Sequence, residues 1–191
     1  MKNILKTKWE WAIYHVSIIY QGQRSIRYYI EAEKTTIQFT KVQMPGFVAI
    51  DDFSRELFAA IMPDKTQYSA EKFLEQVVEE CAYTIEQYYT DNGKEYKGDP
   101  KHHAFMLKCK ENKIEQAFTK VKSPRTNGKA ERVIKTIMDM WHDKTHFNSS
   151  AHRENELKRF VNYYNWVKPH KGIDGLTPGE KLINYFIPEK L

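Results

Sequence analysis

The sequence predicts an α/β domain in which a mixed β-sheet is flanked by helices. Two short apolar runs, Pro45–Asp52 and Glu56–Met62, are joined by a linker that is short enough for a hairpin. We therefore expect two antiparallel neighbouring strands. After this hairpin, segments with helical and strand-like periodicity alternate along the chain, and such alternation is typical of a sheet covered by helices.

The next predicted elements are a helix and a strand. Ser69 is the expected N-cap of the helix. The strand Tyr83–Thr90 stops at the turn sequence Asp-Asn-Gly. The apolar stripe of the helix consists of Phe73, Leu74, Val77, Val78 and Cys81.

The following segment predicts two helices and the strand between them. A short amphipathic helix in residues 103–113 precedes a strand at Ile114–Val121. Pro124 ends that strand, and Thr126 or Asn127 can cap the next helix. The apolar face of this helix is formed by Val133, Ile134, Ile137, Met138 and Trp141.

The two ends of the chain are predicted separately. A last helix, roughly Glu154–Val167, buries one apolar face before the sequence Lys-Pro-His stops it. In the first 44 residues, Trp11–Tyr20 and Ile26–Glu33 resemble strands, and Glu33–Gln43 shows β-branched alternation. We expect a single domain over residues 1–191, because this length suits one core and no linker or repeat interrupts it.

Composition and charge indicate a globular protein whose C-terminal half meets a polyanion. Hydrophobic residues make up 41% of the chain and aromatic residues 14%, which excludes an intrinsically disordered chain. Residues 1–100 carry 12 Lys and Arg against 15 Asp and Glu, whereas residues 101–191 carry 18 against 10. The basic half is the expected polyanion contact, although surplus surface lysines would give the same balance.

Several compartments and site types are not indicated. No apolar run approaches the ~18 residues of a membrane span, and the first residues lack the pattern of a signal peptide. Cys81 and Cys109 lie 28 positions apart without a CxxC pattern, so we expect neither a disulfide nor a cysteine-based zinc site. A reducing cytoplasm fits this cysteine usage best.

Two acidic residues occupy positions that suit metal binding. Asp91 ends a predicted strand, at the edge where open α/β sheets gather ligands, although Asp-Asn-Gly is also an ordinary turn. Glu131 shares the border of an apolar helical stripe with Met138 and His142. The alternative is a helix-dipole role for Glu131, worth ~0.3–1 kcal/mol. The basic residues around it are Arg125, Lys129, Arg132 and Lys135.

Four segments in a fixed order resemble the integrase catalytic core of bacterial insertion-sequence transposases and retroviral integrases. They are FVAIDDFSRELFAAIMPDKTQYSA (47–70), TDNGKEYKG (90–98), PRTNGKAERVIKT (124–136) and YYNWVKPHKGIDGLTP (163–178). Several motifs in order are far more specific than one motif alone. The resemblance covers about Pro45–Lys181, leaving residues 1–44 as a poorly matched part and residues 182–191 as a tail.

The resemblance implies a ribonuclease H-like fold of about five strands and a site with two divalent ions, Mg²⁺ or Mn²⁺. In that family an Asp, a second Asp and a Glu bind the metals, so Asp91 is the implied second acid and Glu131 the third. Carboxylate oxygens suit Mg²⁺, and two such ions can activate a nucleophile and stabilise a leaving oxygen. The implied DNA contacts are Arg125, Asn127, Lys129, Arg132 and Lys135.

The position of the first acid is open between two residues. Glu31 follows an apolar residue 20 positions before Asp51, and it differs from the family's Asp by one methylene. Ser17 has matching flanks in YHVSIIY but carries no carboxylate. We take Glu31 as the catalytic and metal-binding candidate. Asp51 and Asp52 are assigned a structural role at the end of the second strand.

The resemblance implies metal-dependent strand cleavage and transfer on transposon-end DNA during transposition. The expected partners are double-stranded DNA, at the transposon ends and the target, and further copies of the chain. We expect no membrane partner, no nucleotide cofactor, and a cytoplasmic location on the nucleoid. The alternative is a truncated, inactive remnant that keeps the fold and DNA binding, because Glu31 departs from the family pattern and the N-terminal region is too short for a helix-turn-helix domain. A non-specific nuclease of the same fold is a third possibility.

Other polar residues carry weaker signals. His142 and His146 have the spacing of zinc ligands on one helix, but no HExxH motif accompanies them. His102 and His103 lie in an inserted loop and are expected to face solvent. Lys168 stands where the family usually has Arg, so bidentate contacts there are not expected. The residues that match the family's closing motif are Asn165, Pro169 and His170.

Overall fold

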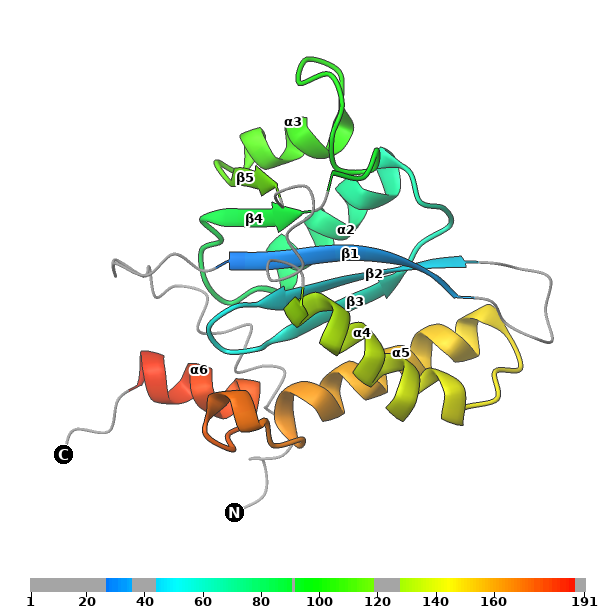
Figure 1. Cartoon of the computed structure of the whole chain (residues 1–191), viewed down its shortest axis with the longest axis vertical. Helices are drawn as coiled ribbons and strands as arrows, with labels where there is room; N and C mark the ends of the chain where they lie inside the picture. Colours follow the sequence, from blue (N-terminus) through cyan, green and yellow to red (C-terminus); the bar gives the residue numbers. More distant parts are fainter. Residues whose placement is uncertain (1–26, 36–43, 91, 119–127, 188–191) are drawn as a thin grey trace.

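A computed structural model gives the fold of residues 27–35, 44–90, 92–118 and 128–187 (Figure 1). For residues 27–35, 44–45 and 128–131 it describes the backbone alone. The strands are β1 (Arg27–Thr35), β2 (Met44–Asp51), β3 (Leu57–Ile61), β4 (Gln87–Thr90) and β5 (Glu115–Phe118). The helices are α2 (Gln67–Glu80), α3 (Ala104–Glu111), α4 (Gly128–Met140), α5 (Ser150–Trp166) and α6 (Pro178–Phe186), with short 3₁₀ helices η2 (His142–Lys144) and η3 (Lys171–Ile173).

The strands form one mixed sheet in the order β3-β2-β1-β4-β5. β1, β2 and β3 are antiparallel neighbours, whereas β4 is parallel to β1 and β5 is parallel to β4. The predicted mixed sheet and its antiparallel hairpin are therefore confirmed. At the hairpin turn, Asp51 Oδ2 accepts hydrogen bonds from Ser54 N at 2.7 Å and Ser54 Oγ at 2.6 Å. Arg55 completes the turn with a φ of 67°.

Helices cover both faces of the sheet. Side chains alternate along β2, so Phe47 and Ala49 pack with residues of α2 and α3, whereas Val48 and Ile50 pack with residues of α4 and α5. Each fully buried Phe, Val or Ile side chain contributes about 1.5–3 kcal/mol. Figure 1 shows α4 and α5 side by side on one face, with α2 on the other.

Two elements differ from their predicted bounds because of specific contacts. α2 begins at Gln67 with Thr66 as its N-cap, so the predicted cap at Ser69 is wrong. Asp64 Oδ1 explains the early start, because it accepts hydrogen bonds from Thr66 Oγ1 and Ser69 Oγ, each at 2.6 Å. β4 is shorter than predicted: it spans Gln87–Thr90, and within the described residues it pairs with β1 from Arg27 to Ile30.

The C-terminal helices also begin earlier or continue further than predicted. Ser149 caps α5 by accepting a hydrogen bond from His152 N at 3.0 Å, so the helix begins before Glu154. α6 was not predicted; it has a capping box between Thr177 and Glu180 and extends into the segment expected as a tail. In the described part of the chain, no helix is both long and apolar enough to span a bilayer.

Candidate active site

The register between β1 and β4 positions the first predicted acid. The two strands are parallel, and their last paired residues are Ile30 and Thr90. Glu31 is the next residue of β1, beyond the end of β4, and it is paired with Val48 on its other side. Asp91, which follows Thr90 in the sequence, lies outside the described residues, as does Ser17. The backbone of Glu31 therefore lies at the carboxyl end of β4.

Helix α4 carries the other predicted acid. Glu131 is the fourth residue of the helix and belongs to its first turn. The buried side chains of α4 pack against β2 and β3 through Val133, Ile134 and Ile137, and the helix also contacts β1. In Figure 1, α4 begins close to β1 and runs away from β4. Glu131 is thus on the helix that contacts the strand carrying Glu31.

The predicted DNA contacts that can be described lie on the exposed face of α4. Arg132 and Lys135 are exposed, and neither belongs to an ion pair among the described residues. Lys129 is in the first turn, where only the backbone is described, and Arg125 and Asn127 lie outside the described residues. Arg132 and Lys135 are thus two exposed basic residues on α4.

Asp51 and Asp52 stabilise the β2–β3 turn, as their predicted role requires. Asp51 is fully buried, and this burial raises the pKa of its carboxyl although its hydrogen bonds to Ser54 oppose the rise. It is paired with Tyr28, three residues before Glu31, which corresponds to roughly 10 Å along the strand. Asp52 forms an ion pair with Arg55 at 3.3 Å.

Two predictions about histidines are wrong. His103 is buried rather than solvated, and its Nε2 contacts the Lys94 carbonyl oxygen at 2.9 Å. Its ring lies against Gly98, where an added Cβ would be 2.4 Å from His103 Cδ2. His142 and His146 do not share an α-helix, because α4 ends at Met140 and His142 belongs to η2. His102 is exposed, as expected.

Comparison with known protein families decides the classification. The integrase core domain family matches residues 6–124, which is more than half of the chain. The chain belongs to the integrase core domain family. A second integrase core domain match covers residues 112–178 of this integrase core, and the family is that of DDE-type transposases and integrases. Among the curated proteins, none matches it.

Two solved structures share the fold of this integrase core. One is the catalytic core domain of BIV integrase, with a TM-score of 0.64 and 19% identity over 85% of this chain and 97% of that chain. The other is from a simian T-cell lymphotropic virus intasome in complex with PP2A regulatory subunit B56 gamma, with a TM-score of 0.69 and 17% identity. The alignment covers 91% of this chain and 59% of that chain. These similarities confirm the predicted ribonuclease H-like fold.

Integrase cores of this family generally depend on divalent metal ions. The described residues contain no group of three or more His, Cys, Asp or Glu side chains that could bind one, but the carboxylates of Glu31, Asp91 and Glu131 are not among the described side chains. The donor set fits such an ion, because carboxylate oxygens are the ligands that Mg²⁺ prefers. The backbone positions of Glu31 and Glu131, on β1 and on the helix that contacts it, also fit.

The closing motif of this integrase core anchors α5 to the edge of the sheet. Asn165 Oδ1 accepts a hydrogen bond from Leu57 N at 2.8 Å, and Asn165 Nδ2 donates one to Leu57 O at 2.9 Å. His170 Nε2 contacts the Tyr164 carbonyl oxygen at 3.0 Å, while Lys168 Nζ lies 5.7 Å from the Tyr164 ring centroid. Two of the matched residues are thus buried within the protein.

Glu56, which the sequence did not single out, carries a strongly perturbed carboxyl group. It precedes β3, and its Oε2 accepts a hydrogen bond from the Tyr83 hydroxyl at 2.9 Å. Burial raises the pKa of Glu56 from 4.5 to about 8, and the charges of Asp51 and Glu80 add to the rise, whereas the Tyr83 hydrogen bond opposes it. The folded protein therefore holds this proton more tightly than the unfolded chain does.

This raised pKa predicts a loss of stability with rising pH. The contribution of Glu56 is fully present below its unfolded pKa of 4.5 and is lost as the pH rises to about 8. Urea unfolding between about pH 5 and pH 9 should show this decrease. Glu56→Gln should flatten the dependence, and Glu154→Gln, at an exposed position, should leave it unchanged. An equally steep decrease in Glu56→Gln would contradict the assignment.

Proposed function

We propose that this integrase core cleaves and transfers DNA strands at transposon ends by metal-dependent phosphoryl transfer. Glu31, Asp91 and Glu131 are the proposed catalytic residues and metal ligands. The observation that carries the proposal is the pairing of Ile30 with Thr90 on parallel strands. Since Glu31 and Asp91 each follow one member of that pair in the sequence, this register supports their meeting at the end of β4.

The chemistry of the residues gives the carboxylates and the basic side chains different proposed roles. The three carboxylates bind two Mg²⁺ or Mn²⁺ ions, and such ions, when bound, supply charge that activates a nucleophilic oxygen and stabilises a leaving one. Exposed Arg132 and Lys135 on α4 neutralise backbone phosphates and hold the DNA beside the carboxylates. The other proposed DNA contacts are Arg125, Asn127 and Lys129.

The proposed partners are double-stranded DNA and further copies of the chain. The net charge of +5 and the concentration of basic residues after residue 100 support a polyanionic partner. One structural neighbour was solved as part of an intasome, which supports association of several copies on DNA. We propose a cytoplasmic protein that acts on the nucleoid.

A specific observation also favours the second candidate, an inactive remnant that keeps the fold and DNA binding. The residue on β1 beside the end of β4 is a glutamate, whereas the resemblance implies an aspartate there. The additional methylene displaces the carboxylate by about 1.5 Å, and Mg²⁺ tolerates little departure from octahedral geometry at 2.0–2.1 Å. Activity assays on variants of this position distinguish the two candidates.

Glu31→Asp is expected to increase metal-dependent DNA cleavage about tenfold or more, because the shorter side chain restores the ligand geometry. The assay is nicking of supercoiled plasmid by the purified chain in Mg²⁺ or Mn²⁺, which requires no knowledge of the transposon ends. Glu31→Gln is the matched control and should reduce cleavage below the wild-type level, because an amide is a poorer metal ligand.

Three results of this cleavage assay distinguish the proposed assignments. A gain in Glu31→Asp supports the proposed ligand set. A gain in Ser17→Asp but not in Glu31→Asp would assign the first acid to the other candidate position. If the wild type and both aspartate variants bind DNA but do not cleave it with Mg²⁺ or Mn²⁺, the chain is the inactive remnant.

A further inference from the structure

A small pocket lies between the sheet and the helices α4 and α5, on the face that carries α4. Its volume is about 30 Å³, and apolar side chains of β2, β3 and α4 line most of it. Arg153 and Leu157 of α5 and Trp141, which follows α4, complete the lining. A cavity of this size holds one or two water molecules or a single small ion.

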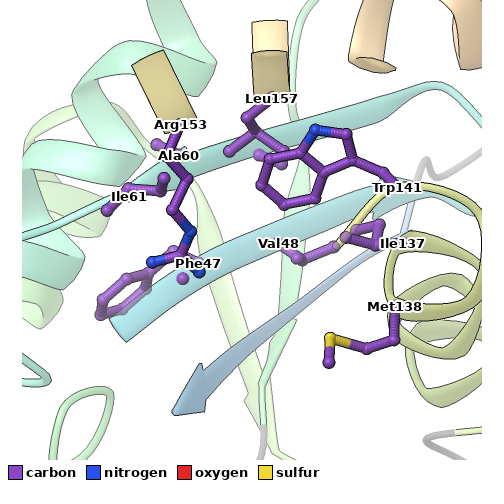
Figure 2. Close-up of a pocket in the computed structure, with 11 residues that line it drawn as sticks. Phe47, Val48, Ala60, Ile61, Ile137, Met138, Trp141, Arg153 and Leu157 are labelled. Carbon is purple, nitrogen blue, oxygen red and sulfur yellow. The ribbon is translucent and has the colours of Figure 1, made fainter. Parts of the chain in front are cut away.

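Among the described residues that line this pocket, Arg153 is the one charged residue. Its relative exposure is 2%, and it is the largest of the fully buried side chains in the described part of the chain. Figure 2 shows the side chain extending from α5 into the pocket. Its Nε and Nη1 atoms are buried and lack hydrogen-bond partners within the described residues. Its aromatic contact is with Phe147, whose ring centroid lies 5.9 Å from Arg153 Cζ.

Among the described residues, this buried guanidinium has no counter-charge. Arginine is not deprotonated in proteins, and removing a charge from water is unfavourable unless the charge is paired. None of the ion pairs among the described residues includes Arg153. Arg153 also lies in the first turn of α5, where the helix dipole disfavours a positive charge.

The rest of the pocket does not supply the missing acceptor. The side chains of its other described lining residues carry no carboxylate, amide or hydroxyl group. The Trp141 indole N–H is a further buried donor without a partner among the described residues, but Figure 2 shows it on the α5 side of its ring, away from the guanidinium. The partner that Arg153 lacks among the described residues is therefore a small, negatively charged group that accepts hydrogen bonds.

We propose that this pocket is an anion site in which Arg153 binds a halide ion or a single carboxylate group. None of the proposed DNA contacts is among the residues that line this pocket, so the site is separate from them. An anion bound there neutralises Arg153 and stabilises the packing of α5 on β2, β3 and α4. The carboxylate can belong to a free acid or to a second copy of the chain.

The test compares the thermal unfolding of the full chain in chloride, formate and sulfate at matched ionic strength. Chloride and formate should stabilise the wild type with a saturable dependence, whereas the larger sulfate should give only a general salt effect. At an anion concentration ten times the dissociation constant, the unfolding equilibrium constant should fall about elevenfold, and the midpoint should rise roughly 3–6 °C.

Two variants on the same helix make the test specific. Arg153→Met removes the guanidinium while keeping a long side chain, so the saturable stabilisation should disappear. Arg159→Met is the matched control, because Arg159 is 78% exposed, and it should respond to chloride as the wild type does. An equal chloride response in Arg153→Met and the wild type, or no saturable response in the wild type, overturns the proposal.

A direct binding measurement covers the case in which Arg153→Met does not fold. The chloride-35 resonance should broaden in the presence of the wild type, and Arg153→Lys, which keeps the charge but loses the guanidinium donors, should broaden it less. Equal broadening overturns the proposal. Sedimentation equilibrium then identifies the source of the anion. If the molecular mass of the protein decreases as chloride is added, the carboxylate comes from a second copy of the chain. If the mass stays constant, the anion is free in solution; both results are consistent with an anion site at Arg153.

Discussion

Glu131→Gln is expected to lower metal-dependent DNA cleavage about a thousandfold, because the amide removes a negatively charged metal ligand while preserving side-chain shape. Metal ions contribute several kcal/mol to transition-state stabilisation, and each 1.36 kcal/mol corresponds to about tenfold in rate. The measurement is plasmid nicking in Mg²⁺ or Mn²⁺, made in the wild type or, if that form is more active, in the Glu31→Asp background.

Asp139→Asn is the matched control for this prediction. Asp139 lies on the same helix, is exposed, and loses the same charge on substitution, so its cleavage rate should remain near the parent value. Salt-sensitive DNA binding should persist in Glu131→Gln, because phosphate contacts come from basic residues such as Arg132 and Lys135. Unchanged cleavage in Glu131→Gln would show that this residue is not catalytic.

Local patterns predicted the elements whose determinants are local. The β2–β3 hairpin follows from two apolar runs and a short turn, and α4 follows from a regular stripe that includes Val133 and Ile137. The start of α2 was predicted incorrectly. Ser69 lies inside the helix instead of capping it, and its hydroxyl donates a hydrogen bond to Asp64, which precedes the helix. The length of β4 depends on its pairing with β1, which is a property of the sheet that no local pattern contains.

The candidate site was predicted in part, for a related reason. Asp91 and Glu131 lie in motifs that resemble the family's, and their roles remain predictions. The sequence alone left Glu31 and Ser17 as alternatives, because the first acid is defined by strand register. The pairing of Ile30 with Thr90 puts the backbone of Glu31 at the end of β4, whereas Ser17 lies outside the described residues, so the choice of Glu31 remains a prediction. Arg153 gave no signal in the sequence, since its importance depends on burial.

Asn165→Ala is expected to reduce the free energy of unfolding by roughly 2–5 kcal/mol, because it leaves two buried backbone groups without partners. β3 is an edge strand, and the Asn165 side chain bonds both the N–H and the carbonyl oxygen of Leu57, at 2.8 and 2.9 Å. Leu57 is fully buried, so water cannot replace these bonds without opening the contact between α5 and β3. Urea unfolding should show a lower midpoint with an unchanged slope.

Asn112→Ala is the control for this prediction, because it removes an asparagine side chain without breaking the bonds to Leu57. Asn112 Nδ2 donates a hydrogen bond to the Lys108 carbonyl oxygen at 2.9 Å, but the pair is exposed, so the change should cost less than about 1 kcal/mol. If Asn165→Ala were no more destabilising than Asn112→Ala, the closing motif would not anchor α5 to the sheet. A large difference would show that the motif holds α5 against the sheet, beside α4, the helix that carries Glu131.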